Sequence, residues 1–343
     1  MSDSIRRAFL LQAQFCEALN SPLTAQVLRT LSDTLNDATR TGARILGWPG
    51  DPMADALKLR IAGGLNALAR SRRDAELTQI YNAGAGHFPT VLKRVLIEWD
   101  DWLFPWLDSP PQTNEVARSG ALWPGLMEIA RRFGPEIELL ELGSSAGLNL
   151  NMDRFGYDLG GVKAGDPASP LQLKPDWNGP QPPLAPVRIV ARAGVDQNPL
   201  DASKPEVTER LLAYIWPDQR ERVARMEAAI AIARQHPPRI ESGDAADWIE
   251  ARLSEPQAEG VTRVIFHSIV LQYLPLEGRQ RVRAAIAETG HHASVNRPLA
   301  WLFMEFRSKA STSPELCLQS WPGRGEESLA DVHPHGAAIH WRG

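Results

Sequence analysis

The sequence contains few cysteines, no long hydrophobic run and no large excess of either charge. Its two cysteines, Cys16 and Cys317, are far apart and do not have the spacing of metal ligands. A disulfide-stabilised scaffold is therefore not expected, and a reducing cytoplasm is the expected location. No segment approaches the roughly 20 apolar residues of a membrane span, and the first ten residues lack the apolar core of a signal peptide.

The net charge of −4 gives no electrostatic basis for binding nucleic acid or an anionic membrane. We therefore expect a small-molecule partner, with no nucleic acid and no membrane. The 343 residues, 43% hydrophobic and 23% charged, are typical of a globular protein with one large domain or two. The oligomeric state cannot be inferred from the sequence.

The N-terminal third of the chain shows helical spacing of apolar residues and little strand signal. We expect a helical cap domain over residues 1–112 and an α/β domain over residues 113–343. Within the second domain, residues 156–186 are rich in Gly, Pro and Asp, and we expect an irregular insertion that forms a lid or is disordered.

Strand and helix signals alternate after residue 137, which favours a mostly parallel, Rossmann-like sheet in an α/β fold. Residues 316–342 predict two short strands around Gly323–Gly325, which would form an antiparallel hairpin at the sheet edge. The predicted strands cover residues 137–142, 187–191, 239–241, 261–266 and 299–306, and the helices between them lie near 206–215, 217–234, 245–253 and 276–289.

Residues 137–150 carry the strongest functional signal. An apolar run reaches Glu141 and breaks at Gly143, and Gly147 then opens an amphipathic segment that ends at Gly156. This order predicts a buried strand, a tight turn and the start of a helix. Such a turn presents free backbone N–H groups to a ligand above the sheet edge, and a carboxylate at the strand end accepts hydrogen bonds from a ribose. A nucleotide-like cofactor is expected here.

A helix over about 114–132 precedes the first strand, with Thr113 or Asn114 as its N-cap. The connecting turn is short, so the start of this helix returns to the carboxyl end of the strand. Arg118 is then placed to bind a carboxylate or phosphate above the glycine loop. The competing interpretation is a surface ion pair between Arg118 and Glu115.

Acidic residues follow the next two strands. Asp196, with Gln197 after it, is expected to bind a ribose hydroxyl, although a solvated loop carboxylate is the alternative. Gly243 lets the backbone approach a flat ligand, and Asp244 can accept a hydrogen bond from an exocyclic amine. Asp247 is expected to be a helix N-cap.

The segment from His267 through Ser268 to Tyr273 follows the fourth strand and places polar groups over the same sheet edge. His267 is a candidate acid/base group, or a residue that only forms hydrogen bonds within the loop. Tyr273 is the second candidate for proton transfer.

These residues resemble the motifs of class I S-adenosylmethionine-dependent methyltransferases. Glu141–Gly147 resembles the acidic-x-Gly-x-x-x-Gly first motif, Gly194–Asp196 the second, Gly243–Ala245 the third, and His267–Tyr273 the fourth. Over nearly its whole length the chain also resembles a bacterial domain-of-unknown-function family (family 2332), for which no activity is known. The landmarks of that resemblance are residues 113–118, 145–149, 153–154, 272–275 and 333–336.

The methyltransferase resemblance implies S-adenosylmethionine as cofactor and a small-molecule methyl acceptor. It implies that the methionine carboxylate meets Gly143–Gly147 and Arg118, the ribose Asp196, and the adenine Asp244–Ala245. Ser145 occupies the middle position of the usual glycine triplet and narrows the approach to the backbone. The implied cofactor-binding residues are Asn114, Arg118, Glu141, Gly143, Ser144, Ser145, Ala146, Gly147, Asn149, Asp196, Gln197, Gly243, Asp244, Ala245, His267 and Ser268, and the catalytic candidates are His267 and Tyr273.

Three alternatives stay open at this point. A non-catalytic binding protein with the same fold is one, and a nicotinamide-dependent oxidoreductase, for which the loop lacks two required glycines, is another. The third is an α/β-hydrolase with Ser145 in a Gly-x-Ser-x-Gly elbow, completed by Asp244 or Asp247 and by His333 or His335. The last two histidines also suggest a metal pair or a turn.

Overall fold

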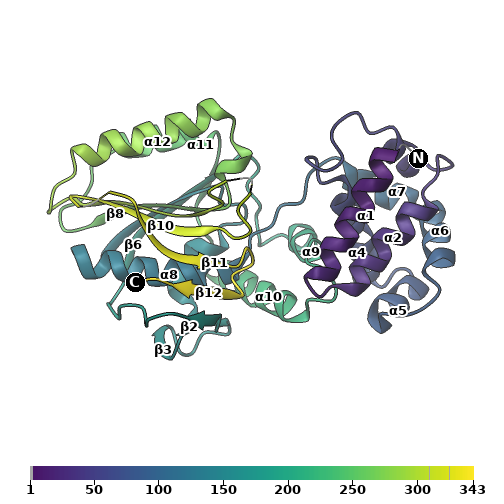
Figure 1. Ribbon diagram of the computed structural model, residues 1–343, viewed down its shortest axis with the longest axis horizontal. Helices are drawn as coiled ribbons and strands as arrows, with labels where there is room; N and C mark the ends of the chain where they lie inside the picture. Colours follow the sequence, from purple (N-terminus) through teal and green to yellow (C-terminus); the bar gives the residue numbers. More distant parts are fainter. Residues whose placement is uncertain (1–2, 309, 324) are drawn as a thin grey trace. The chain divides into compact units, whose positions relative to one another are not determined.

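Two parts of the chain fold as separate units, each around its own buried core (Figure 1). The first unit comprises Met1–Thr113 and Lys204–Glu227, and the second comprises Asn114–Ser203 and Ala228–Gly343. The computed structural model describes residues 3–308, 310–323 and 325–343. The sequence placed a boundary after residue 112 and assigned everything beyond it to the α/β domain, whereas residues 204–227 belong to the first unit.

The first unit is helical. Its helices are α1 (Asp3–Ala18), α2 (Pro22–Thr34), α3 (Arg40–Leu46), α4 (Leu57–Ser71), α5 (Ala75–Ala83), α6 (Phe88–Glu98), α7 (Asp100–Leu103), the 3₁₀ helix η1 (Phe104–Leu107) and α9 (Pro205–Ala213). Helix α4 is buried on almost all of its faces, so its polar residues need partners within the protein. Arg60 meets this need by donating to the carbonyl oxygens of Asp55 and Leu107.

The returning segment 204–227 joins the first unit through α4. The side-chain amide of Asn66 donates to the carbonyl oxygens of Ala213 and Ile215 at 3.0 and 2.9 Å. The ring of Tyr214 lies 2.6 Å from the position that a Cβ on Gly63 would occupy, so only glycine admits the ring at this distance. These contacts explain why α9 packs with helices that precede it by more than a hundred residues.

The same segment also caps α2. The carboxylate of Asp218 accepts from the backbone N–H groups of Leu23 and Thr24, both at 3.1 Å, and from the Thr24 hydroxyl at 3.0 Å. Ser21, the residue at the N-cap position, makes no capping hydrogen bond, and its buried hydroxyl has no partner among the described residues. A distant carboxylate therefore satisfies the N–H groups that a local cap would otherwise satisfy.

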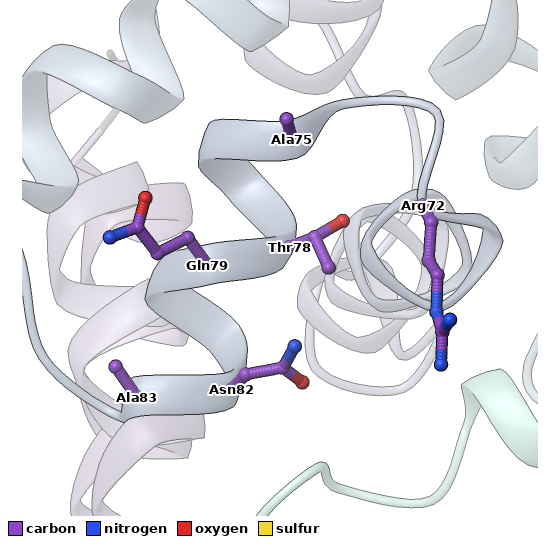
Figure 2. Close-up of a pocket in the computed structure, with 6 residues that line it drawn as sticks. All are labelled: Arg72, Ala75, Thr78, Gln79, Asn82 and Ala83. Atoms are coloured by element: carbon purple, nitrogen blue, oxygen red, sulfur yellow. The ribbon is translucent and has the colours of Figure 1, made fainter.

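A surface hollow of about 640 Å³ lies on this unit. Figure 2 shows Arg72 at the end of α4 and, along α5, Ala75, Thr78, Gln79, Asn82 and Ala83. The lining combines one arginine with amides, a hydroxyl and methyl groups. This lining includes no carboxylate, imidazole or thiol. It therefore has fewer groups suited to acid/base or nucleophilic catalysis than the sheet edge of the second unit.

The second unit contains two sheets. Its helical elements are η2 (Val116–Arg118), α8 (Ser119–Phe133), η3 (Leu148–Arg154), α11 (Ala245–Ser254), η4 (Leu271–Tyr273) and α12 (Leu276–His291), and α10 (Arg220–Gln235) enters it from the first unit. The strands are β1 (Glu136–Leu142), β2 (Gly156–Leu159), β3 (Val162–Gly165), β4 (Gln172–Leu173), β5 (Asp176–Asn178), β6 (Arg188–Asp196), β7 (Ile240–Ser242), β8 (Thr262–Ser268), β9 (Leu299–Glu305), β10 (Glu315–Trp321), β11 (Glu327–Val332) and β12 (Ala338–Trp341).

The large sheet has the order β5-β12-β11-β10-β9-β8-β1-β6-β7. Strands β9, β8, β1, β6 and β7 are parallel, and β10, β11 and β12 follow as antiparallel neighbours. The mixed α/β sheet, mostly parallel with antiparallel C-terminal strands, agrees with the sequence prediction at this level. The C-terminal part differs in having three strands rather than a two-stranded hairpin.

Helices cover both faces of the large sheet (Figure 1). Helices α11 and α12 pack on one face through Ile249 and Ile286, against Leu140 and Trp301 among others. Helix α8 packs on the other face. There the Leu302 side chain lies 2.6 Å from the position that a Cβ on Gly125 would occupy, so it packs directly on this glycine. Residues alternate between the two faces along each strand, so Glu141 lies on the α8 face with Leu139.

The segment predicted as an irregular insertion is ordered. Strands β2, β3 and β4 form a small separate sheet in the order β3-β2-β4, and β5 pairs in parallel with β12 at the edge of the large sheet. Short strands interrupted by Gly and Pro give too weak an alternation to predict from the sequence. None of the helices in the described part of the chain combines the length and apolar character needed to cross a membrane.

We expect Asp218→Ala to lower the free energy of unfolding of the first unit by about 1 to 2 kcal/mol, because three donors at the start of α2 lose their acceptor. Ser21→Ala is the matched control and should change stability by less than about 0.5 kcal/mol, since the Ser21 hydroxyl makes no hydrogen bond to any described residue. Urea denaturation of both variants measures this difference. Equal effects would contradict capping by Asp218.

Candidate functional site

The candidate site lies at the carboxyl ends of β1, β6 and β8. From β1 the chain continues to β6 and β7 on one side, and later to β8 and β9 on the other side. The strand order therefore reverses between β1 and β8. In open α/β sheets, ligands bind outside the carboxyl ends of the strands at such a reversal.

The loop after β1 has an unusual backbone conformation. Gly143 and Gly147 have φ values of +66° and +65°, which glycine adopts readily. Ser145 has φ +53° without being glycine, a conformation that costs energy and is retained where surrounding contacts impose it. The turn predicted from the two glycines is therefore confirmed. The helix predicted to start after it is the 3₁₀ helix η3, which is kinked at Asn151.

The N–H groups of this loop are mostly used within the protein. Ser144 N donates to Val195 O at 3.0 Å, Ser145 N to Asp196 Oδ2 at 2.8 Å, and Gly147 N to Ser144 O at 2.7 Å. The prediction that the loop presents bare amides to a ligand is wrong for these three groups. A hydrogen-bond acceptor was available to each from the loop itself or from β6, and the sequence pattern does not reveal such pairing.

Two asparagines of the site also have structural partners. The Asn114 side chain accepts from Leu148 N at 2.9 Å, and the Asn149 side chain accepts from the Ser119 hydroxyl at 2.8 Å. These bonds tie the segment before α8 to the start of η3. Both asparagines are buried, so their side-chain oxygens organise the loop.

Glu141 is the most unusual ionisable group at the site. The residue is 3% exposed, and Oε2 has no hydrogen-bond partner among the described residues. Burial raises the pKa of this carboxyl well above its ordinary value, and the neighbouring Asp196 carboxylate raises it further. A buried carboxyl without a partner is costly unless it is protonated or a ligand supplies a donor.

Ser145 adds a second buried oxygen without a partner. Its residue is 5% exposed, and its Oγ makes no hydrogen bond to any residue that the structure describes. A hydrolytic serine needs a base within hydrogen-bond reach, but neither His333 nor His335 bonds to this oxygen. Asp244 caps α11 instead, through Ala246 N and Asp247 N. The geometry does not assemble the triad of the hydrolase alternative.

Ser144 and Ala146, the other residues of the loop, are buried within it. The Ser144 hydroxyl donates to Glu141 O at 3.0 Å, and a Cβ on Gly194 would lie 2.1 Å from this hydroxyl. The glycine of β6 thus makes room for the loop after β1. Ala146 is only 1% exposed. Both side chains contribute packing to the loop.

Arg118 joins two other loops. Its guanidinium donates to Ser268 O at 2.9 Å, to Ser268 Oγ at 3.3 Å and to Pro334 O at 2.9 Å. The helix geometry thus brings Arg118 to the carboxyl end of the sheet, as the sequence predicted. These partners are protein oxygens. The Glu115 carboxylate accepts from Ala117 N at 3.2 Å.

His267 is buried in a network of its own. The Trp301 indole N–H donates to His267 Nε2 at 3.0 Å, so the ring proton lies on Nδ1, which donates to Glu305 Oε1 at 2.8 Å. The residue is 0% exposed. Both ring nitrogens are engaged, so the geometry gives His267 a structural role in place of the predicted acid/base role.

Tyr273, the second catalytic candidate, is 77% exposed on η4. Its side chain remains available to a bound molecule, and its backbone N–H donates to Val270 O at 2.9 Å. The same loop contains Ile269, whose φ of +57° is rare for a β-branched residue. Two of the non-glycine residues with positive φ, Ser145 and Ile269, therefore lie on loops at this sheet edge.

The residues after β6 and β7 connect the two strand ends. Asp196 accepts from Ser145 N and Asn198 N, and its carbonyl accepts from Gly243 N at 3.1 Å. The Gln197 carbonyl accepts from the Ser242 hydroxyl at 3.3 Å. Asp196 thus bonds to the glycine loop, and its contact with a ribose hydroxyl stays a prediction.

The residues assigned to the adenine contact lie at the start of α11. Asp244 is the N-cap and Ala245 the first residue of this helix, whereas Asp247 was the predicted N-cap. The Asp247 carboxylate instead forms an ion pair with Arg281 at 2.7 Å. The sequence allows either aspartate as the N-cap of α11. The structure shows that Asp244 makes the capping hydrogen bonds, to Ala246 N and Asp247 N.

Sequence reasoning singled out the loop after β8 but missed Glu305, the residue that holds it. Glu305 Oε1 accepts from His267 Nδ1, from Val270 N at 2.7 Å and from Leu271 N at 3.1 Å. The sequence signal that could have identified Glu305 is its position as the one acidic residue at the end of β9, a strand that is otherwise apolar. Burial alone would raise the pKa of Glu305, but the bonds from His267 and the two backbone N–H groups lower it.

The two C-terminal histidines form a turn. His335 N donates to His333 Nδ1 at 3.1 Å, and Gly336 N donates to His333 O at 2.7 Å. Among the described residues there is no cluster of three or more His, Cys, Asp or Glu side chains placed to hold a metal. The turn interpretation of these residues is therefore the one that the geometry supports.

The chain belongs to a family of uncharacterised proteins conserved in bacteria, the DUF2332 family, whose model matches residues 6–341. No curated protein and no solved structure matches the chain. Family membership confirms that part of the resemblance found in the sequence. It brings no activity with it, and no match bears on the resemblance to class I methyltransferases.

We expect Glu141→Gln to be more stable than the wild type at pH 8 and equally stable at low pH. A carboxyl whose native pKa is raised favours the folded state below its unfolded pKa of about 4.5 and loses that contribution as the pH rises toward the native value. The wild type should therefore lose up to about 1.4 kcal/mol per pH unit relative to the variant in this range. Urea denaturation between pH 4 and 8 measures the gap, and a constant gap would contradict a raised pKa.

Proposed function

We propose that the second unit binds S-adenosylmethionine at the carboxyl ends of β1, β6 and β8, and that the protein transfers the methyl group to a small molecule. The observation that carries this proposal is the buried Glu141 carboxyl, whose Oε2 lacks a partner among the described residues. It lies where the strand order reverses, which is the ligand position in open α/β sheets.

The donor groups of this cofactor suit the oxygens at the site. An ammonium or hydroxyl group next to Glu141 would supply the missing hydrogen bond and favour the ionised carboxylate. The Ser145 hydroxyl can act as donor or acceptor toward the same ligand. Because Ser144, Ser145 and Gly147 use their N–H groups internally, the cofactor carboxylate would need other donors than these three amides.

When bound, S-adenosylmethionine supplies an electrophilic methyl group on a sulfonium, and the protein supplies orientation and a base where the acceptor must lose a proton. Asp196 is the candidate partner of the ribose, next to the loop that it holds in place. Tyr273 is the remaining candidate for proton transfer, because it is exposed on the loop after β8. The net charge of −4 favours a small acceptor over a nucleic acid.

Binding without methyl transfer is the second candidate function. The observation that favours it is the engagement of both nitrogens of His267, which was one of the two catalytic candidates. The two functions differ in whether S-adenosylhomocysteine forms from S-adenosylmethionine when the wild type receives a small-molecule fraction of a bacterial extract. Formation by the wild type and not by Glu141→Ala supports transfer.

We expect titration calorimetry to show binding of S-adenosylmethionine and S-adenosylhomocysteine to the wild type. Glu141→Ala should weaken both affinities at least about tenfold, which corresponds to about 1.4 kcal/mol, because the buried acceptor is lost. Glu136→Ala is the control, since Glu136 lies at the opposite end of the same strand. Absence of binding to the wild type, or equal affinities for both variants, would overturn the proposal.

A further inference from the structure

The loop after β8 is held by a carboxylate from the neighbouring strand. Glu305 ends β9, is 7% exposed, and uses one oxygen, Oε1, as the acceptor for His267 Nδ1, Val270 N and Leu271 N. The Trp301 indole holds the other nitrogen of His267. A side-chain donor from β8 and two backbone donors from the loop after it thus converge on a single buried oxygen.

This anchoring has consequences for the backbone of the loop. Ile269 lies between the anchored residues with φ +57°, a backbone conformation that is strained for a β-branched residue. Its N–H donates to Met304 O at 2.8 Å, next to Glu305. A strained residue persists where the contacts around it fix the backbone, and here β9 and Glu305 supply those contacts.

The anchored loop contacts the other parts of the candidate site. The methyl carbons of Val270 lie 2.7 and 2.8 Å from the position that a Cβ on Gly143 would occupy, so Val270 packs directly on the glycine loop. Ser268 accepts from Arg118 through both its carbonyl and its hydroxyl. Displacing the loop would therefore disturb Gly143 and Arg118 together.

We propose that Glu305 is the positioning residue of this site, which fixes the loop 268–271 against Gly143 in the form that binds ligand. The inference rests on the proposed function and adds a residue that acts through the loop without touching the ligand. The carbonyl oxygen of a glutamine can accept the same hydrogen bonds, whereas leucine removes the acceptor and aspartate withdraws it by one methylene. Glu305→Gln therefore preserves the anchor, and Glu305→Leu and Glu305→Asp break it.

Hydrogen exchange on the ligand-free protein tests the anchor without any ligand. In Glu305→Leu, or in Glu305→Asp if the leucine variant does not fold, the amides of Val270 and Leu271 should exchange at least tenfold faster than in the wild type. Glu305→Gln should stay within threefold of the wild type. Glu128→Gln is the control, because Glu128 is also buried but pairs with Arg131 and Arg132 on α8. Unchanged exchange in both anchor-breaking variants would overturn the inference.

Calorimetry with S-adenosylmethionine then tests the link to binding. The affinity should fall at least tenfold in the anchor-breaking variants, stay within threefold in Glu305→Gln, and be unchanged in Glu128→Gln. Equal affinities across the series, with a wild type that binds, would overturn the positioning role. A wild type that binds no S-adenosylmethionine would overturn the proposed function instead, and the exchange experiment would still decide whether Glu305 anchors the loop.

Discussion

The functional interpretation depends on one constraint, a buried carboxyl oxygen, Glu141 Oε2, that has no hydrogen-bond partner among the described residues. Water would satisfy both oxygens of Glu141, but the folded chain leaves Oε2 buried and without a partner among the described residues. Burying this carboxyl costs free energy, and the nearby Asp196 carboxylate increases that cost. Glu141 lies near the end of β1. A residue chosen for stability alone would be apolar here, as Leu140 and Leu142 are on the opposite face of the strand.

The loops around this carboxyl are held by two other acidic residues with hydrogen-bonded carboxylates. Asp196 fixes the glycine loop through Ser145 N, and Glu305 fixes the loop after β8 through Val270 N and Leu271 N. Each carboxylate holds a loop that contains a non-glycine residue with positive φ. The two loops meet where Val270 packs on Gly143. Two strained residues and two hydrogen-bonded carboxylates thus surround Glu141, whose Oε2 has no partner among the described residues, and this arrangement supports the ligand site that we propose.

Much of the fold could be predicted from local patterns, whereas the partners of its polar groups could not. The parallel strands followed from apolar runs such as Val261–Phe266, and the turn at Gly143 followed from its two glycines. Asp218 capping α2, however, depends on a residue nearly two hundred positions away. No spacing rule connects such positions, because the fold brings them together only after both elements exist.

At the candidate site too, the positions of residues could be predicted from the sequence and their hydrogen-bond partners could not. The sequence predicted that Glu141, Asp196 and Arg118 would lie at one sheet edge, since strand ends and helix starts fix those positions. It did not predict that loop amides would bond to Val195 and Asp196, or that Glu305 and Trp301 would engage His267. Residue type and position after a strand indicate where a side chain lies, but its hydrogen-bond partners depend on tertiary contacts.

Infrared difference spectroscopy of Glu141 tests the central claim most directly. The ligand-free wild type should show the C=O band of a protonated carboxyl at pH values where an ordinary glutamate is ionised, and Glu141→Gln should lack this band. Addition of S-adenosylmethionine should remove or shift it, because the ligand supplies the missing partner. A wild type without the band, or a band that the ligand leaves unchanged, would contradict the assignment of this carboxyl to a ligand site.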